Sequence, residues 1–366
     1  MHPRPNHIIN PADGAQQVMI SPYSARTTHF LHSEPTPFAQ RLIAWQKRHG
    51  RHDLPWQQSR DPYRIWLSEI MLQQTQVAAV LPYYQRFLER YPDLSTLAAA
   101  SLDDVLQTWS GLGYYARGRN LHQAAQQVMR EFGGCFPSDP AALAELPGIG
   151  RSTAAAIAVF AFGARAAILD GNVKRVLCRH AGIEGFPGLP AVEKKLWVLA
   201  ESRLPGQEVE AYTQGLMDLG SGVCLRHRPV CTDCPLSADC IAFVEGRQND
   251  LPSPKPRSKL PERTATFVLI TDGRAVLLKR RPPKGLWGGL LVPPEGDPET
   301  ILGELGFVSE GAHALPELKH RFTHFQLTLR PVVCPLAVRP TGPDHASWHW
   351  QELGALEQAV GLAQLG

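Results

Sequence analysis

The sequence predicts two folded domains, the first all-helical and the second of mixed α+β structure. From Pro37 to about Phe243, apolar side chains recur at spacings of three, four and seven, as they do along one face of a helix. Residues 251–263 then hold four prolines and four basic side chains, which is typical of an extended linker. Beyond the linker, β-branched and apolar runs predict strands. A chain of 366 residues is also longer than one hydrophobic core usually organises.

The turn and linker residues between these runs predict the domain boundaries. Thr264 to Thr271 and Arg274 to Lys279 are joined by Asp272-Gly273, a two-residue turn typical of a hairpin, and further strands are expected at about 325 to 338. The first residues contain Pro, Asn, His and Ser without periodicity and predict a disordered tail. The expected boundaries are 1–36 for the tail, 37–250 for the helical domain, 251–263 for the linker and 264–366 for the α+β domain.

Composition restricts where the protein acts. The net charge of +3 is only mildly basic, so a nucleic-acid surface requires local clustering of Lys and Arg. The longest run of small apolar residues, Thr153 to Leu169, is interrupted by Arg165 and is shorter than the roughly 20 residues that span a bilayer. Four of the seven cysteines fall in one short stretch, which favours a metal site in a reducing compartment. We therefore expect a cytoplasmic protein, in the bacterial cytosol with the nucleoid.

Cys224, Cys231, Cys234 and Cys240 follow the spacing C-x6-C-x2-C-x5-C, so four thiolates can converge on one metal site. The spacing alone leaves zinc or buried free thiols open, with iron-sulfur favoured because only one C-x2-C pair is present. The same spacing resembles the iron-sulfur loop of the endonuclease III family of glycosylases, which implies a [4Fe-4S] cluster. The neighbouring basic residues would face DNA phosphates; they are Arg226, His227, Arg228 and Arg247.

A glycine-rich turn precedes a single aspartate. Leu146-Pro147-Gly148-Ile149-Gly150 lies between two helical patterns, and such a turn exposes backbone amides that bind anions. Asp170 follows an apolar run and begins a helix, where an aspartate is more often an N-cap than a catalytic group. The turn, the aspartate about twenty residues later and the cysteine loop together resemble the helix-hairpin-helix glycosylase superfamily, in which this aspartate is catalytic.

Three further segments narrow the resemblance. Trp66 to Val77, Gly111 to Arg117 and Ile168 to Val176 resemble the adenine glycosylases of the MutY family. The resemblance implies a base-excision repair enzyme that acts on double-stranded DNA as a monomer. It would remove adenine opposite 8-oxoguanine or guanine.

Cleavage of the bond to adenine needs a proton on the leaving base and a negative charge beside the cationic sugar, so two carboxylates suit it. By resemblance, Glu69 protonates adenine and activates water, Asp170 stabilises or traps the sugar cation, and Asn172 hydrogen-bonds within the site. Apolar neighbours such as Trp66 and Ile70 would raise the pKa of Glu69 by desolvation, whereas Asp170 must stay ionised. Without the family motif, a solvated carboxylate on a helix face is the favoured interpretation of Glu69.

The base must leave the duplex before it can react. By resemblance, Leu54, Trp56 and Gln214 line the adenine pocket, while Gln73, Gln74 and Tyr114 fill or wedge the gap in the DNA. The remaining expected DNA contacts are Leu112, Gly113, Gly148, Gly150 and Ser152.

Ser152 stands where lyase members of the superfamily carry a nucleophilic lysine. Because a serine cannot form a Schiff base, we expect a monofunctional glycosylase. Lys174 is close enough to Asp170 in sequence to form an incidental adduct.

The C-terminal domain resembles the Nudix-like domain with which MutY proteins recognise 8-oxoguanine. Gly285 to Gly289 carries part of the resemblance, and Phe322-Thr323-His324 occupies the place of the family's Phe-Ser-His recognition loop. Pro298 to Phe307 holds only Glu299 and Glu304, so the glutamate run that binds metal in nucleotide-hydrolysing relatives is missing.

Three other functions remain open. An endonuclease III type oxidised-pyrimidine glycosylase with lyase activity is opposed by Ser152 and by the extra domain. A non-enzymatic iron-sulfur protein that binds DNA would not need Glu69 or Asp170. A nucleotide pyrophosphatase is opposed by the missing glutamates.

Overall fold

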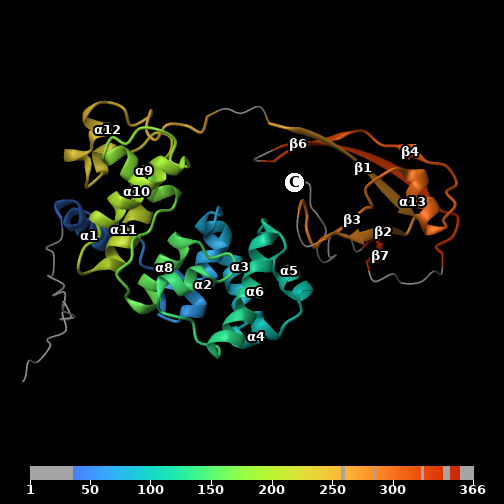
Figure 1. Ribbon diagram of the computed structural model, residues 1–366, viewed down its shortest axis with the longest axis horizontal. Coiled ribbons are helices and arrows are strands. Elements are labelled where there is room, and N and C mark those ends of the chain that lie inside the picture. The colour runs from blue at the N-terminus through green and yellow to red at the C-terminus, as the bar shows by residue number, and fades with distance from the viewer. Residues whose placement is uncertain (1–35, 257–259, 283–284, 323–324, 341–346, 355–366) are drawn as a thin grey trace, which may run out of the picture. The chain divides into compact units, whose positions relative to one another are not determined.

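A computed structural model describes residues 36–256, 260–282, 285–322, 325–340 and 347–354 (Figure 1). Helices occupy the first part of the chain and strands the second, in the predicted order. The helical elements are α1 (Pro37–His49), η1 (Pro55–Gln58), α2 (Pro62–Leu72), α3 (Val77–Arg90), α4 (Leu94–Ala99), α5 (Leu102–Trp109), α6 (Tyr115–Phe132), α7 (Pro140–Ala144), α8 (Arg151–Phe162), α9 (Gly171–His180), α10 (Pro190–Ser202), α11 (Val209–Gly222), η2 (Cys231–Asp233), η3 (Ser237–Asp239) and α12 (Ile241–Val244).

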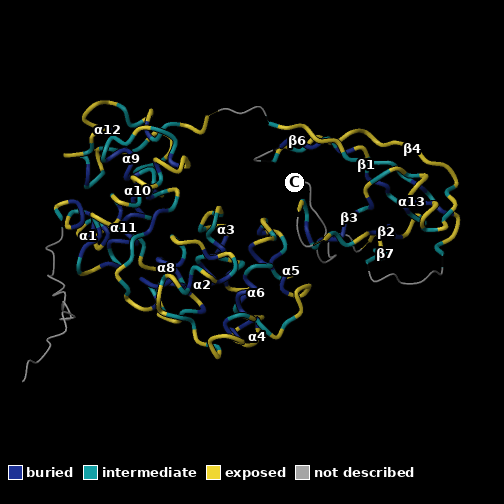
Figure 2. The backbone as a smooth tube through the Cα atoms, viewed as in Figure 1, coloured by how far each residue is buried: buried dark blue, intermediate teal, exposed yellow. Residues whose placement is uncertain are grey.

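Two apolar cores organise the helices. The first is built by α2 to α6 around side chains without solvent exposure such as Trp66, Phe87 and Trp109. The second is built mainly by α1, α9, α10 and α11, with Leu42 and Leu177 at its centre. Figure 2 shows these buried residues as dark segments along the helices. Each core is covered by polar helix faces, as the periodicity predicted.

Helix α8 belongs to both cores. Ala154 and Ile157 pack in the first core, whereas Ala155 and Val159 pack in the second. The helix contacts α2 on one side and α11 on the other. A helix that is apolar on nearly all sides is buried between neighbours. The Thr153 to Leu169 run therefore supplies an internal helix, and none of the described helices is long and apolar enough to cross a membrane.

The turn before α8 has the backbone that its glycines permit. Gly148 has φ +78°, and a Cβ there would meet the Asn120 Cβ at 2.8 Å. Gly150 is the N-cap of α8. Helices α7 and α8 are thus joined by a turn whose position 148 accommodates only glycine.

The strands form a separate sheet with order β3-β2-β1-β6-β4, in which β5 also pairs with β6 and β7 with β2. The predicted hairpin is present, with Thr271 opposite Val276. Helix α13 (Pro298–Leu305) packs on this sheet through Ile301 and Leu302. The bounds are β1 (Glu262–Thr271), β2 (Ala275–Arg280), β3 (Leu291–Val292), β4 (His313–Ala314), β5 (Leu318–Arg321), β6 (Gln326–Pro335) and β7 (Trp348–Glu352). Strand β1 begins inside the stretch predicted as linker, because its first residues pair in parallel with β6.

Candidate active site

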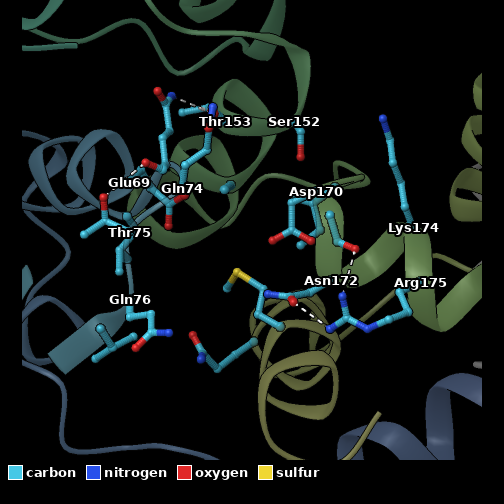
Figure 3. A pocket seen from close by; sticks show the side chains of 18 of the residues that line it. Glu69, Gln74, Thr75, Gln76, Ser152, Thr153, Asp170, Asn172, Lys174 and Arg175 are labelled. Atoms are coloured by element: carbon cyan, nitrogen blue, oxygen red, sulfur yellow. Dashed lines mark hydrogen bonds between the residues drawn. The ribbon is translucent and has the colours of Figure 1, made fainter. Parts of the chain in front are cut away.

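A cavity of about 1520 Å³ opens between the two helical cores (Figure 3). Its walls come from η1, α2, α8, α9, α11 and the loops between them. The cavity brings together residues that lie far apart in the chain, from position 46 to position 255. Of the residues predicted to form the site, it is lined by Leu54, Trp56, Glu69, Gln73, Gln74, Ser152, Asp170, Asn172 and Gln214.

Glu69 projects from the second half of α2 into this cavity. Its helix neighbours Ser68 and Ile70 are buried, so the carboxyl group is surrounded by protein although it keeps access to the cavity. Burial, and secondarily the charge of Asp170, raise the pKa of Glu69 to about 8. Glu69 is therefore protonated near neutral pH.

Asp170 is both the N-cap of α9 and a wall of the cavity. Its side chain accepts a hydrogen bond of 2.7 Å from the Val173 amide. Burial raises the pKa of Asp170. The backbone amides of Val173 and Asn172, followed by the charges of Arg175 and Lys174, oppose that rise.

The surroundings of the two carboxyl groups thus favour different protonation states. Hydrogen bonds and cations stabilise the charged form of Asp170, while the causes acting on Glu69 all disfavour its charge. In a pair that carries one proton, the proton resides on Glu69 and the negative charge on Asp170. This arrangement provides an acid and an anion in one cavity.

Asn172 is held by Arg175, whose Nη2 donates to the Asn172 Oδ1 at 2.8 Å. The same guanidinium donates to the carbonyl groups of Gly220 and Cys224. Gly220 lets α11 approach α9 closely, because a Cβ there would meet the Asn172 Cβ at 2.5 Å. Asn172 is therefore fixed in the first turn of α9.

Ser152 supports the backbone that leads to Asp170. Its Oγ accepts a hydrogen bond of 2.9 Å from the Leu169 amide. Lys174 also lines the cavity, but its ammonium group forms a salt bridge of 2.6 Å with Glu193. Ser152, expected by resemblance to stand in place of a lyase lysine, is thus a hydroxyl group with a structural partner.

Several predicted DNA contacts lie outside the cavity walls. Tyr114, with φ +50° and 54% of its surface exposed, precedes α6. Gln73 connects the cavity to the glycine turn, because its Nε2 donates to the Gly148 carbonyl at 3.2 Å. The predicted residues that do not line the cavity are Leu112, Gly113, Tyr114, Gly148 and Gly150.

The four clustered cysteines line a second, small cavity of about 20 Å³. Burial raises the pKa of Cys234 to about 12, and also raises that of Cys231 and Cys240. Arg179 Nη1 donates to the Cys224 Sγ at 3.3 Å. In the described part of the chain, no three metal-binding side chains converge closely enough for a single ion. The donor set of four thiols around one cavity nevertheless suits a larger, thiolate-bound group whose positive charge stabilises the ionised thiols.

In the sheet domain, Phe322 follows β5 and belongs to an aromatic cluster. Its ring stacks on Phe325 at 4.7 Å and meets Trp287 edge-on at 6.2 Å. The Gly285 to Gly289 motif and the predicted recognition loop are therefore in contact through Trp287 and Phe322. Thr323 and His324 lie outside the described residues.

The sequence prediction missed several cavity residues. Arg51 and His52 line the cavity from the loop after α1, and Met217 lines it from α11. Their proximity to the predicted Leu54 and Gln214 was the only available signal in the sequence. Met217 and Gln214 are three positions apart on a helix, which places them on one face.

Comparisons with known proteins agree with this division of the chain. A family described as "HhH-GPD superfamily base excision DNA repair protein" matches residues 67–202, and a NUDIX domain matches residues 265–364. The matches confirm the predicted fold class of a helical glycosylase domain followed by a Nudix-like domain.

Relatives matched over most of the chain are also similar. The adenine DNA glycosylase of Buchnera aphidicola subsp. Acyrthosiphon pisum is 37% identical over 303 residues, covering 82% of this chain and 87% of its own. That of Homo sapiens is 35% identical over 392 residues, covering 87% and 71%. Among solved structures, a thermostable thymine-DNA glycosylase has a TM-score of 0.53 and 31% identity, and the match covers 57% of this chain and 95% of that one.

Proposed function

The chain belongs to the adenine DNA glycosylase family, and we propose that it removes adenine paired with 8-oxoguanine or guanine in double-stranded DNA. The observation that carries the chemical part of this proposal is the pair of unlike carboxyl groups in one cavity. Burial and the charge of Asp170 keep Glu69 protonated, while amides and cations support the charge of Asp170.

We infer that Glu69 acts as the general acid. A flipped adenine in the cavity would receive the Glu69 proton on a ring nitrogen as its bond to the sugar breaks. Asp170 then stabilises or briefly traps the positive sugar carbon, and the ionised Glu69 accepts a proton from the attacking water. Atoms and charge balance, because the proton given to the base is recovered from the water.

The reaction stops at the abasic site in this proposal. Ser152 cannot form a Schiff base with the sugar, and the Lys174 ammonium is engaged by Glu193. The product is therefore an intact strand with a missing base, which makes the enzyme monofunctional.

We also propose which residues in and around the same cavity contact the DNA. Leu54, Trp56 and Gln214 would enclose the base, with Asn172 holding the site beside Asp170. Gln73, Gln74 and Tyr114 would occupy the gap that the base leaves. The residues proposed to contact the surrounding DNA are Leu112, Gly113, Gly148, Gly150 and Ser152.

The four cysteines are proposed to hold a [4Fe-4S] cluster with a structural role. Their shared cavity, and the Arg179 hydrogen bond to Cys224, support this assignment. The cluster would hold the loop with Arg226 and Arg228, which line the main cavity, against the DNA backbone.

The sheet domain, over residues 264–366, is proposed to recognise the opposite base through Phe322, Thr323 and His324. This proposal is supported by the contact of the Phe322 ring with Trp287, which fixes the first residue of the proposed recognition loop. The remaining boundaries are proposed as predicted, with a tail over 1–36, a catalytic domain over 37–250 and a linker over 251–263. We further propose that the protein acts as a monomer. We place it in the cytoplasm, because four clustered cysteines that bind a cluster need a reducing compartment.

Single-turnover excision tests the proposal. Duplexes with adenine opposite 8-oxoguanine, guanine or thymine would be incubated with excess protein, and strand breaks counted after alkali. We expect removal of adenine opposite 8-oxoguanine and guanine, with no strand breaks before alkali. Excision of oxidised pyrimidines instead of adenine would refute the proposal.

A further inference from the structure

We propose that Asp218 is a positioning residue that fixes which end of the Gln214 amide faces the base, and thereby sets the preference for a purine with a 6-amino group. This inference rests on the proposed function and deepens it by naming the source of base specificity. It concerns a buried carboxylate that the chemistry of the two catalytic groups does not use.

Gln214 and Asp218 are four positions apart on α11, so their side chains are neighbours on one helix face. Both are buried, with 8% and 5% of their surfaces exposed. Gln214 lines the main cavity and Asp218 does not, which places the carboxylate behind the amide.

Asp218 receives hydrogen bonds from three donors. Gln214 Nε2 donates to its Oδ1 at 2.8 Å, Arg51 Nε donates to the same oxygen at 2.7 Å, and the Arg51 amide donates to Oδ2 at 2.9 Å. An ionised carboxylate only accepts hydrogen bonds. A reversed Gln214 amide would place its carbonyl oxygen against a carboxylate oxygen, so the nitrogen must face Asp218.

The amide oxygen is consequently the end left for the base. No described residue donates a hydrogen bond to Gln214 Oε1, and Gln214 is part of the cavity wall. An acceptor at this place matches the N6 amino group of adenine, which is a donor. It opposes the O6 atom of a 6-oxopurine, which is an acceptor.

A purely structural role for Asp218 would have a different signature. The Arg51 pair ties the loop after α1 to α11, so losing it could slow every substrate equally. Orientation of Gln214, in contrast, affects only bases that carry the 6-amino group. The ratio of the excision rates for a base with the 6-amino group and a base without it therefore distinguishes the two roles.

The test compares duplexes containing adenine or 2′-deoxynebularine, whose base lacks the 6-amino group, opposite guanine. Asp218→Asn keeps the shape but supplies a donor, so the Gln214 amide can reverse. We expect the single-turnover rate for adenine to fall about tenfold while that for nebularine changes less than about threefold. Gln214→Ala should lower the ratio of the adenine rate to the nebularine rate to a similar value. The double variant should lower this ratio no further.

Glu208→Gln is the matched control, because Glu208 also joins α11 to α1, through a salt bridge with Lys47, and does not line the cavity. Its ratio should equal that of the unaltered protein. Equal slowing of both substrates in Asp218→Asn, or an unchanged ratio in Gln214→Ala, would overturn the inference. If Asp218→Asn does not fold, the ratio of the rates for adenine and nebularine in Asp218→Ala decides, because this variant removes the acceptor of the Gln214 amide. An unaltered protein that removes neither base would refute the proposed function instead.

Discussion

Glu69 and Asp170 show how a single residue obtains its role from its neighbours. Both carboxyl groups line one cavity, but only Asp170 sits at a helix N-terminus, where free amides and the helix dipole favour a negative charge. The N-cap role expected of an isolated aspartate and the proposed catalytic role therefore coincide. The amides that Asp170 caps at the start of α9 favour its charged form and oppose the rise in its pKa that burial causes.

The protonation of Glu69 predicts the pH dependence of excision. With a pKa of about 8, the acid form is lost as pH rises, so the single-turnover rate should fall about tenfold per unit above pH 8. At low pH the rate should fall again as Asp170 becomes protonated. A pH series of adenine excision measures both limbs.

Glu69→Gln should lower excision by about 10² to 10⁴, because the amide cannot supply the proton. Binding to mismatched DNA, measured by anisotropy, should stay within a few-fold of the unaltered protein. The alkaline limb should also disappear from any residual activity. A variant that retains full turnover would contradict the acid role.

Ser152→Lys should introduce some strand nicking, since it places an amine on the wall that holds Asp170. It should also cost stability, because the Ser152 hydrogen bond to the Leu169 amide is lost. Ser152→Ala separates the effects: it removes the hydrogen bond without adding an amine. Borohydride trapping measures the effect of the added amine, and thermal unfolding measures the effect of the lost hydrogen bond. Equal trapping in the unaltered protein and in Ser152→Lys would contradict the proposed role of Ser152.

At the scale of the element, the helices and their ends were predictable because their causes are local. The helical periodicity, the Asp272-Gly273 hairpin and the Asp170 cap each depend on residues close in sequence. The Arg51 and Asp218 pair was not predictable, because 167 positions separate its members and no local pattern links them. The start of β1 was misplaced for the same reason, since its first residues are ordered by pairing with β6.

The turn before α8 offers a test at this scale. Gly148→Ala should lower the free energy of unfolding by about 1 to 2 kcal/mol, because φ is positive and the new Cβ would crowd Asn120. Gly150→Ala is the control, since its backbone is extended and a Cβ there meets no atom within 4 Å. Denaturant unfolding compares the two variants. Equal stability would mean that the turn relaxes without loss.

At the scale of the whole molecule, each domain has its own apolar core. Val268, Ile270 and Leu277 pack within the sheet domain, while the two helical cores close without it. Among the described residues, those lining the candidate active-site cavity belong to the helical domain and the start of the linker, the last being Lys255. The chemistry and the recognition of the opposite base that we propose thus belong to different parts of the chain.

Removing residues 264–366 should leave adenine excision measurable and reduce the preference for 8-oxoguanine over guanine. A polar contact to a base edge is worth about 1 to 3 kcal/mol, so discrimination should drop by roughly one to two orders of magnitude. Thr323→Ala in the full chain should reproduce part of the loss. Unchanged discrimination in the truncated protein would show that recognition lies elsewhere.

Helix α8 has one face in each apolar core, so we expect it to couple the unfolding of the two cores. Opening either core exposes one face of α8 and withdraws packing from the other, so the two cores are expected to melt in a single cooperative transition. Glu69 and Asp170, which come from the α2 and α9 sides of this helix, would keep their mutual arrangement until that transition. A state in which one core is unfolded and the candidate active site is half assembled would then be rare.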